Sequence, residues 1–212
     1  MQKMQTMRNP IKKSVTAVML TAIFLAICIL TVSCDGDNKR VAFSPRSGSY
    51  EIMLDGSEWA HSDGETVWDL WIHRTTAPMM LVQIDYFPKE NMIPLGVSDF
   101  YSFIRYYRTQ GIIMELYEFE YGEVRELEVM DMSSRYLRGS DVIAGKRQQI
   151  FISLPPEENH PGRDSVTELV FLETEGHFFA IRYNAEIRDI DRAMSLVNDM
   201  VQNLRMLRYE DV

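Results

Sequence analysis

The residues of this chain with the clearest chemical potential are acidic and close together. Seven carboxylates fall between Glu115 and Asp131, with Arg125 as the single base among them. On paired strands, like charges directly opposite one another are destabilising, and a hard cation such as Ca²⁺ would relieve that repulsion by taking several carboxylate oxygens. We prefer the interpretation of a solvated sheet face that discourages aggregation. The alternative is a cation site built from Glu118, Glu120, Glu126 and Glu128.

Sequence motifs for catalysis or metal binding are otherwise absent. The chain has neither the nucleophile elbow G-x-S-x-G nor a phosphate-binding G-x-G-x-x-G or Walker loop. No two histidines have metal-ligand spacing, and we expect His160 and His177 to be exposed. We therefore predict a protein that is not an enzyme and has no cofactor or metal. The four histidines are His61, His73, His160 and His177.

The tryptophans are the best candidates for contact with another molecule. Trp68 and Trp71 are three residues apart, so on a strand they face opposite sides of the sheet. One of them would then lie outside the core, where an exposed tryptophan favours a binding hot spot. The alternative is that helices or loops cover both. We predict Trp68 and Trp71 as the candidate partner-binding residues.

The beginning of the chain has the pattern of an export signal. Four basic residues and no acid precede Ser14, and no charge follows until Ser33 has been passed. A basic segment followed by an apolar one is typical of a signal peptide, and the positive side remains in the cytoplasm. The apolar run is nearly long enough to span a bilayer as a helix, which takes about 20 residues. An uncleaved membrane anchor is therefore the alternative.

The residues around Cys34 favour cleavage and lipidation. The segment Leu30-Thr31-Val32-Ser33-Cys34 resembles the bacterial lipobox, in which the cysteine is diacylated and becomes the first residue of the mature protein. The resemblance departs at Thr31, where the motif usually has leucine. It implies attachment to the cell membrane or the outer membrane through acylated Cys34, with the domain facing the periplasm or the exterior. Two acyl chains give stable anchoring.

Composition limits the class of partner. The chain has 22 basic and 31 acidic residues. Residues 1–33 contain four of the basic residues and no acid, so the remainder has 18 basic residues and a formal charge of −13. So acidic a domain is a poor binder of polyanions, and we expect no nucleic-acid partner. A protein partner is the leading expectation, and the alternative is a small molecule or cation held between sheet and helix or at the acidic hairpin.

The pattern of apolar residues predicts an α+β domain. We expect a signal peptide over 1–33, a tether over 34–48 and one domain over 49–212, with 41–43 as an alternative first strand. Tyr50, Ile52 and Leu54 alternate as in a half-buried strand. Further strands are expected over 67–74, 79–87 and 112–132, over 133–154 as two strands turning at Ala144-Gly145, and over 168–184 as a hairpin turning at Glu175-Gly176.

Two helices are expected around these strands. The first covers 97–111, with Val97, Phe100, Tyr101, Ile104 and Tyr107 as its buried stripe and Ser98 or Asp99 as its cap. The second has an apolar stripe at spacings of three and four, which includes Ile187, Ile190, Met194, Val197, Val201 and Leu204. Strands in consecutive runs with separate helices predict a mostly antiparallel sheet flanked by two main helices.

This order of elements resembles the PsbP-like fold, which includes the extrinsic photosystem II protein, a Ran-binding import factor and bacterial lipoproteins of the DcrB type. Four segments carry the resemblance: DGSEW after the first strand, the helix SDFYSFIRYY, the hairpin strand FFAIRYNAE and the closing helix DIDRAMSLVNDMVQNL. The resemblance covers about residues 49–207 and contains no catalytic motif. It implies a binding or assembly module, although fold alone does not fix function.

Overall fold

The structure is a computed structural model, and it describes residues 40–45, 49–63, 68–74, 80–109, 123–154 and 163–207. The chain divides into two compact units, Met1–Asp37 and Asn38–Val212, and the described residues all belong to the second. The predicted leader and Cys34 therefore lie outside the described residues. No helix of the described part is long and apolar enough to cross a membrane.

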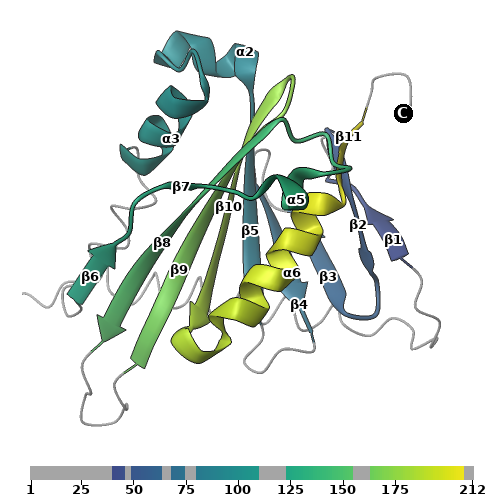
Figure 1. The fold of residues 1–212 in the computed structure, drawn as a ribbon. Helices are drawn as coiled ribbons and strands as arrows, with labels where there is room; N and C mark the ends of the chain where they lie inside the picture. The colour runs from purple at the N-terminus through teal and green to yellow at the C-terminus, as the bar shows by residue number, and fades with distance from the viewer. Residues whose placement is uncertain are drawn as a thin grey trace, which may run out of the picture. The chain divides into compact units, whose positions relative to one another are not determined.

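The second unit contains two antiparallel sheets (Figure 1). The small sheet has the order β1-β2-β11, and the large sheet has the order β3-β4-β5-β10-β9-β8-β6, with β7 paired to β8. The strands of the small sheet are β1 (Arg40–Phe43), β2 (Tyr50–Asp55) and β11 (Leu204–Met206). The strands of the large sheet are β3 (Trp59–Asp63), β4 (Trp68–His73), β5 (Met80–Pro88), β6 (Glu123–Glu126), β7 (Met130–Asp131), β8 (Ala144–Leu154), β9 (Arg163–Glu173) and β10 (His177–Glu186).

The helices lie on both faces of the large sheet. α3 (Phe100–Thr109) packs with one set of buried side chains on β8, β9 and β10, and α6 (Ile190–Gln202) packs with the alternate set and with the small sheet. Along β9, Leu169 and Phe171 belong to the α3 side, whereas Val170 and Leu172 belong to the α6 side. This is the α+β arrangement that the sequence predicted. The shorter helices are α2 (Lys89–Met92), η1 (Ile93–Leu95), α5 (Ser134–Leu137) and η2 (Ile187–Asp189).

Several predicted elements are confirmed. β2 buries Tyr50, Ile52 and Leu54, and the β9–β10 hairpin pairs Glu173 with Phe178 across the turn. Residues 40–43, predicted as tether with a strand as the alternative, form β1 and pair with β2. Strands were predicted over 112–132, and residues 112–122 of that range lie outside the described part of the chain.

The predicted turn at Ala144-Gly145 is wrong, because both residues belong to the continuous strand β8. The segment before it forms α5 instead of a strand. Gly145 has a packing reason, since a Cβ there would lie 2.9 Å from Met132 Sδ and 3.1 Å from Leu137 Cδ2. Glycine here permits a close approach between β8 and α5. The sequence alone does not distinguish a glycine with this role from a glycine in a turn.

The predicted faces of β4 and α3 also need correction. In β4 the alternation of Trp68, Leu70 and Ile72 predicts one apolar face. Ile72 is buried, but the alternate residues Asp69, Trp71 and His73 are buried more deeply. In α3, the buried residues are Phe100, Phe103, Ile104 and Tyr107, and Tyr101 is exposed.

Candidate functional site

The tryptophan prediction has an uneven outcome. Trp71 has no exposed surface and packs edge-on against Phe43 with ring centroids 5.4 Å apart, so its side chain is not available to a partner. The side chain of Trp68 lies outside the described residues. The two positions do belong to one strand, β4, as the spacing indicated.

The acidic cluster is only partly described. Glu118 and Glu120 lie outside the described residues, and Glu128 is exposed. Glu126 is occupied by other groups: Arg108 donates to it at 2.7 Å and Gln148 Nε2 at 2.9 Å. Within the ranges that the structure describes, no three His, Cys, Asp or Glu residues are placed to hold a metal ion.

The described histidines lie in separate surroundings. His61 Nε2 lies 3.2 Å from Asp69 Oδ1, and His73 Nε2 lies 3.7 Å from Glu58. His177, which we expected to be exposed, is half-buried at the start of β10, and burial lowers its pKa. His160 lies outside the described residues.

Three buried carboxylates of the large sheet each accept a hydrogen bond from a tyrosine. Tyr50 donates to Asp69 at 2.6 Å, Tyr107 of α3 donates to Asp85, and Tyr183 donates to Glu168. Buried polar groups need such partners because an unpaired one loses its hydration without compensation. These pairs were not predicted, because each acid occupies an alternate position in a strand whose pattern is that of a half-exposed strand.

Glu168 is the most enclosed of the three, with 0% of its surface exposed. Its second oxygen lies 3.3 Å from Arg147 Nε, and the same guanidinium donates to Asn198 Oδ1 of α6 at 2.6 Å. Burial raises the pKa of Glu168 to about 7, against the opposing effect of Arg147. A perturbed acid often marks an active site, but a catalytic group must reach a substrate, and this one is sealed beneath α6. We assign it a structural role.

The surface with the most exposed apolar side chains is formed by η1 and the first turn of α3. Three of its residues are largely exposed: Ile93 at 67%, Leu95 at 53% and Tyr101 at 70%. Tyr101 and Arg105 are four residues apart on α3 and therefore lie on one side of the helix. We call Ile93, Leu95, Tyr101 and Arg105 the η1–α3 surface. Exposed apolar groups that gather on one surface mark interaction sites, and Leu95 and Arg105 line one pocket there.

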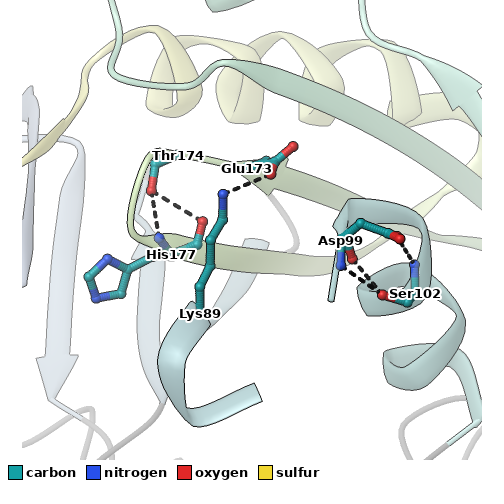
Figure 2. Close-up of polar contacts among 6 residues, drawn as sticks. All are labelled: Lys89, Asp99, Ser102, Glu173, Thr174 and His177. Atoms are coloured by element: carbon teal, nitrogen blue, oxygen red, sulfur yellow. Dashed lines mark hydrogen bonds and ion pairs between the residues drawn. The ribbon is translucent and has the colours of Figure 1, made fainter. Parts of the chain in front are cut away.

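Local contacts hold this surface in place (Figure 2). Asp99 caps α3 by accepting a hydrogen bond from Ser102 N at 2.8 Å, which lowers the pKa of Asp99. Below the helix, Phe103 stacks on Phe178 with ring centroids 4.7 Å apart. The chain enters α3 through Gly96, whose φ of 79° favours glycine.

The neighbouring segment is also fixed. Lys89 Nζ lies 2.7 Å from Glu173 Oε1 and 5.0 Å from the centre of the Phe178 ring. The tip of the β9–β10 hairpin is closed by Thr174, whose hydroxyl accepts from His177 N at 3.1 Å (Figure 2). The η1–α3 surface is therefore presented by a preformed frame, which lowers the ordering cost of binding.

A small pocket adjoins the η1–α3 surface. Its volume is about 240 Å³, below the range of about 300–1,000 Å³ of pockets that hold drug-sized ligands, and its lining includes Leu95, Arg105 and Tyr106. A second pocket, of about 350 Å³, is lined by Tyr136 of α5 and by residues of α6 that include Asp191 and Asp199. The η1–α3 surface was not predicted, because Tyr101 was assigned to the buried stripe of the helix. The available signal was the spacing of Phe100, Phe103, Ile104 and Tyr107, which leaves Tyr101 off the buried stripe.

No family model matches the chain, and no curated protein matches it. Among solved structures, the fold is similar to cyanobacterial PsbP from Synechocystis, with 11% identity, a TM-score of 0.46 and coverage of 83% of this chain and 98% of that one. It is also similar to the Ran-binding protein Mog1p of Saccharomyces cerevisiae (7% identity, TM-score 0.47, coverage 82% and 98%). A third is LpqN of Mycobacterium tuberculosis, described as involved in cell envelope biogenesis (10%, 0.40, 82% and 88%). A PsbP protein, the kind that the order of elements resembles, is thus among the similar structures. The function proposed below rests on this chain's own residues.

Proposed function

We propose that this protein is a lipid-anchored protein of the cell envelope whose domain binds a protein partner through the η1–α3 surface, without catalysis of its own. The observation that carries the binding role is the exposure of Ile93, Leu95 and Tyr101 on a rigid frame. The anchoring role is carried by the sequence that ends at Cys34.

The position of the surface suits a tethered domain. Arg40, the first described residue, pairs with Asp55 of β2, and a short turn joins Asp55 to Trp59 of β3. Trp59 pairs with His73 of β4, and His73 pairs with Met80 at the beginning of β5. α2 and η1 follow Pro88 at the other end of β5. Arg40 and the η1–α3 surface therefore lie toward opposite ends of β5 (Figure 1).

The buried acids support a role without catalysis. Asp69, Asp85 and Glu168 each have a tyrosine partner inside the domain. Their environment serves packing, because every one of them is at least 95% covered.

One observation favours a second candidate, the binding of a small molecule or cation. The pocket along α6 is lined by Asp191, Asp199 and Gln202 and is large enough for a small ligand. Calorimetric titration with Ca²⁺ tests the cation version: heat of binding that is lost in Asp191→Asn would favour it, and no heat together with an unchanged melting temperature would remove it.

Two measurements in cells test the main proposal. Cys34→Ala should abolish acylation and the processing of the leader, whereas an unchanged size and unchanged membrane retention, with no lipid on the wild type, would favour the uncleaved anchor. A photo-crosslinking amino acid at Tyr101 should give a discrete protein adduct. The same group at Ile187, which is 46% exposed in η2, is the control. Equal adducts at both positions would remove the η1–α3 surface from the proposal.

A further inference from the structure

The charge on α3 differs from that of the domain around it. The helix sequence FYSFIRYYRT contains Arg105 and Arg108 and no acid, although residues 34–212 carry the formal charge of −13 derived above. Arg105 is exposed and has no ionic partner among the described residues, whereas the other cations near this end are already paired. Those pairs are Arg108 with Glu126, Lys89 with Glu173, and Lys146 with Asp131.

Arg105 also lines the pocket beside Leu95. Two of the pocket's three lining residues with a hydroxyl, Ser102 and Thr109, have theirs engaged: Ser102 Oγ donates to Asp99 O at 2.8 Å, and Thr109 Oγ1 donates to Arg105 O at 3.0 Å. Arg105 is then the charged donor that the pocket retains for another molecule. A guanidinium matches the planar geometry of a carboxylate and can bind it through two hydrogen bonds.

The size of the pocket limits what can enter. At about 240 Å³ it lies below the range of about 300–1,000 Å³ of pockets that hold drug-sized ligands, and a side chain or a chain end fits within it. Apolar contact is available at its rim, because Leu95 belongs both to the pocket and to the η1–α3 surface.

We infer that the η1–α3 surface recognises an acidic, apolar segment of a protein, with a carboxylate of that segment on Arg105 and an adjacent apolar side chain on Leu95 and Tyr101. This inference rests on the proposed function and adds the chemistry of the partner. Charge complementarity at Arg105 selects a carboxylate: a short segment meets only the local charge of α3, which has two arginines and no acid, whereas an anionic bilayer would face the formal charge of −13 on residues 34–212.

The test is a selection of displayed random peptides against the full-length protein held in lipid nanodiscs. We expect the enriched peptides to combine an apolar residue with Asp, Glu or a free C-terminus. Their amide counterparts, with Asn, Gln or a C-terminal amide, should bind roughly tenfold more weakly, which corresponds to about 1.4 kcal/mol, because an amide lacks the charge that strengthens a hydrogen bond to Arg105. Arg105→Gln should erase that tenfold preference, while the control Arg192→Gln, at an exposed arginine of α6, should preserve it.

Each other outcome decides against the inference. Enriched peptides without a carboxylate that still require Leu95 and Tyr101 would overturn the partner chemistry and leave the proposed function intact. Failure of any peptide to exceed its binding to the double variant Ile93→Ser, Leu95→Ser would overturn both. Binding of phosphatidylglycerol vesicles, or a dimer that Tyr101→Ala dissociates, in place of peptide binding would replace the protein segment with a membrane or a second copy.

Discussion

Replacing Glu168 by glutamine tests whether the carboxyl group enclosed beneath α6 is protonated in the folded protein. Glutamine has nearly the same volume, and its side-chain oxygen can still accept from the Tyr183 hydroxyl. The substitution therefore removes the titration of Glu168 and leaves the packing against β9 and α6 almost unchanged. Arg147, 3.3 Å away, and Tyr183 are the ionisable groups in contact with it.

The direction of the pH effect follows from the pKa. Burial raises the pKa of Glu168 from 4.5 to about 7. A group whose pKa is raised on folding stabilises the folded state fully below its unfolded pKa, and this stabilisation is lost as the pH rises through the folded pKa. A difference of about 2.5 pKa units corresponds to about 3 kcal/mol at 1.36 kcal/mol per unit. Most of this loss falls between pH 5 and pH 8.

The assay is urea unfolding of a fragment that begins at Asp35, measured at half-unit steps from pH 5 to pH 8. At pH 5 the wild type and Glu168→Gln should have similar free energies of unfolding. By pH 8 the wild type should have lost about 2–3 kcal/mol relative to the variant. Glu175→Gln, at the exposed tip of the β9–β10 hairpin, controls for the general effect of removing an acid.

One result would refute this reasoning. If Glu168 is ionised in the folded protein, its attraction to Arg147 outweighs the loss of hydration. Glu168→Gln would then leave a buried guanidinium without its counter-charge, at a cost of about 3–5 kcal/mol. A gap of that size in favour of the wild type, constant or growing toward pH 8, would show that the ion pair dominates and that burial does not.

Two further predictions concern packing and the second buried acid. Tyr107→Phe removes the hydrogen-bond donor to Asp85, whose pKa is raised by burial against the opposing effect of that hydrogen bond. In urea unfolding the substitution should destabilise the domain by about 1–3 kcal/mol, and by more at pH 8 than at pH 5. A loss no greater than that of Tyr106→Phe would contradict this. Gly145→Ala should lower the thermal midpoint and cost about 1–3 kcal/mol of stability, because the new Cβ would lie 2.9 Å from Met132 Sδ. Gly176→Ala is the control: nothing lies within 4 Å of its new Cβ, so it should cause no comparable shift in the midpoint.

The elements that the sequence predicted well are those with a single covered face. α6 exposes one side, so the spacing of Val197 and Val201 identifies its buried stripe. Ile187, which the stripe was predicted to include, lies in η2 and is exposed. β2 buries Tyr50, Ile52 and Leu54 and leaves the alternate residues half-buried. In both elements, alternation of apolar and polar residues reports the direction of the core faithfully.

The prediction fails where both faces of a strand are covered. In β4, the polar residues Asp69 and His73 are typical of a solvent face, but they are buried together with Trp71. Periodicity cannot detect this, because the partner that makes a buried Asp69 tolerable is Tyr50, on a different sheet and 19 residues earlier in the chain. Tertiary contact, and not local pattern, decides which polar positions are buried.

The same double coverage bears on where this domain can meet another molecule. α3 occupies one face of the large sheet, and α6 with the small sheet occupies the other. The buried acids Asp69, Asp85 and Glu168 each accept a hydrogen bond from a tyrosine inside the domain. Binding must then use side chains that the layers leave uncovered, and at the junction of η1 and α3 these are apolar groups beside Arg105. Under the proposed function, this surface holds a complementary segment of the partner.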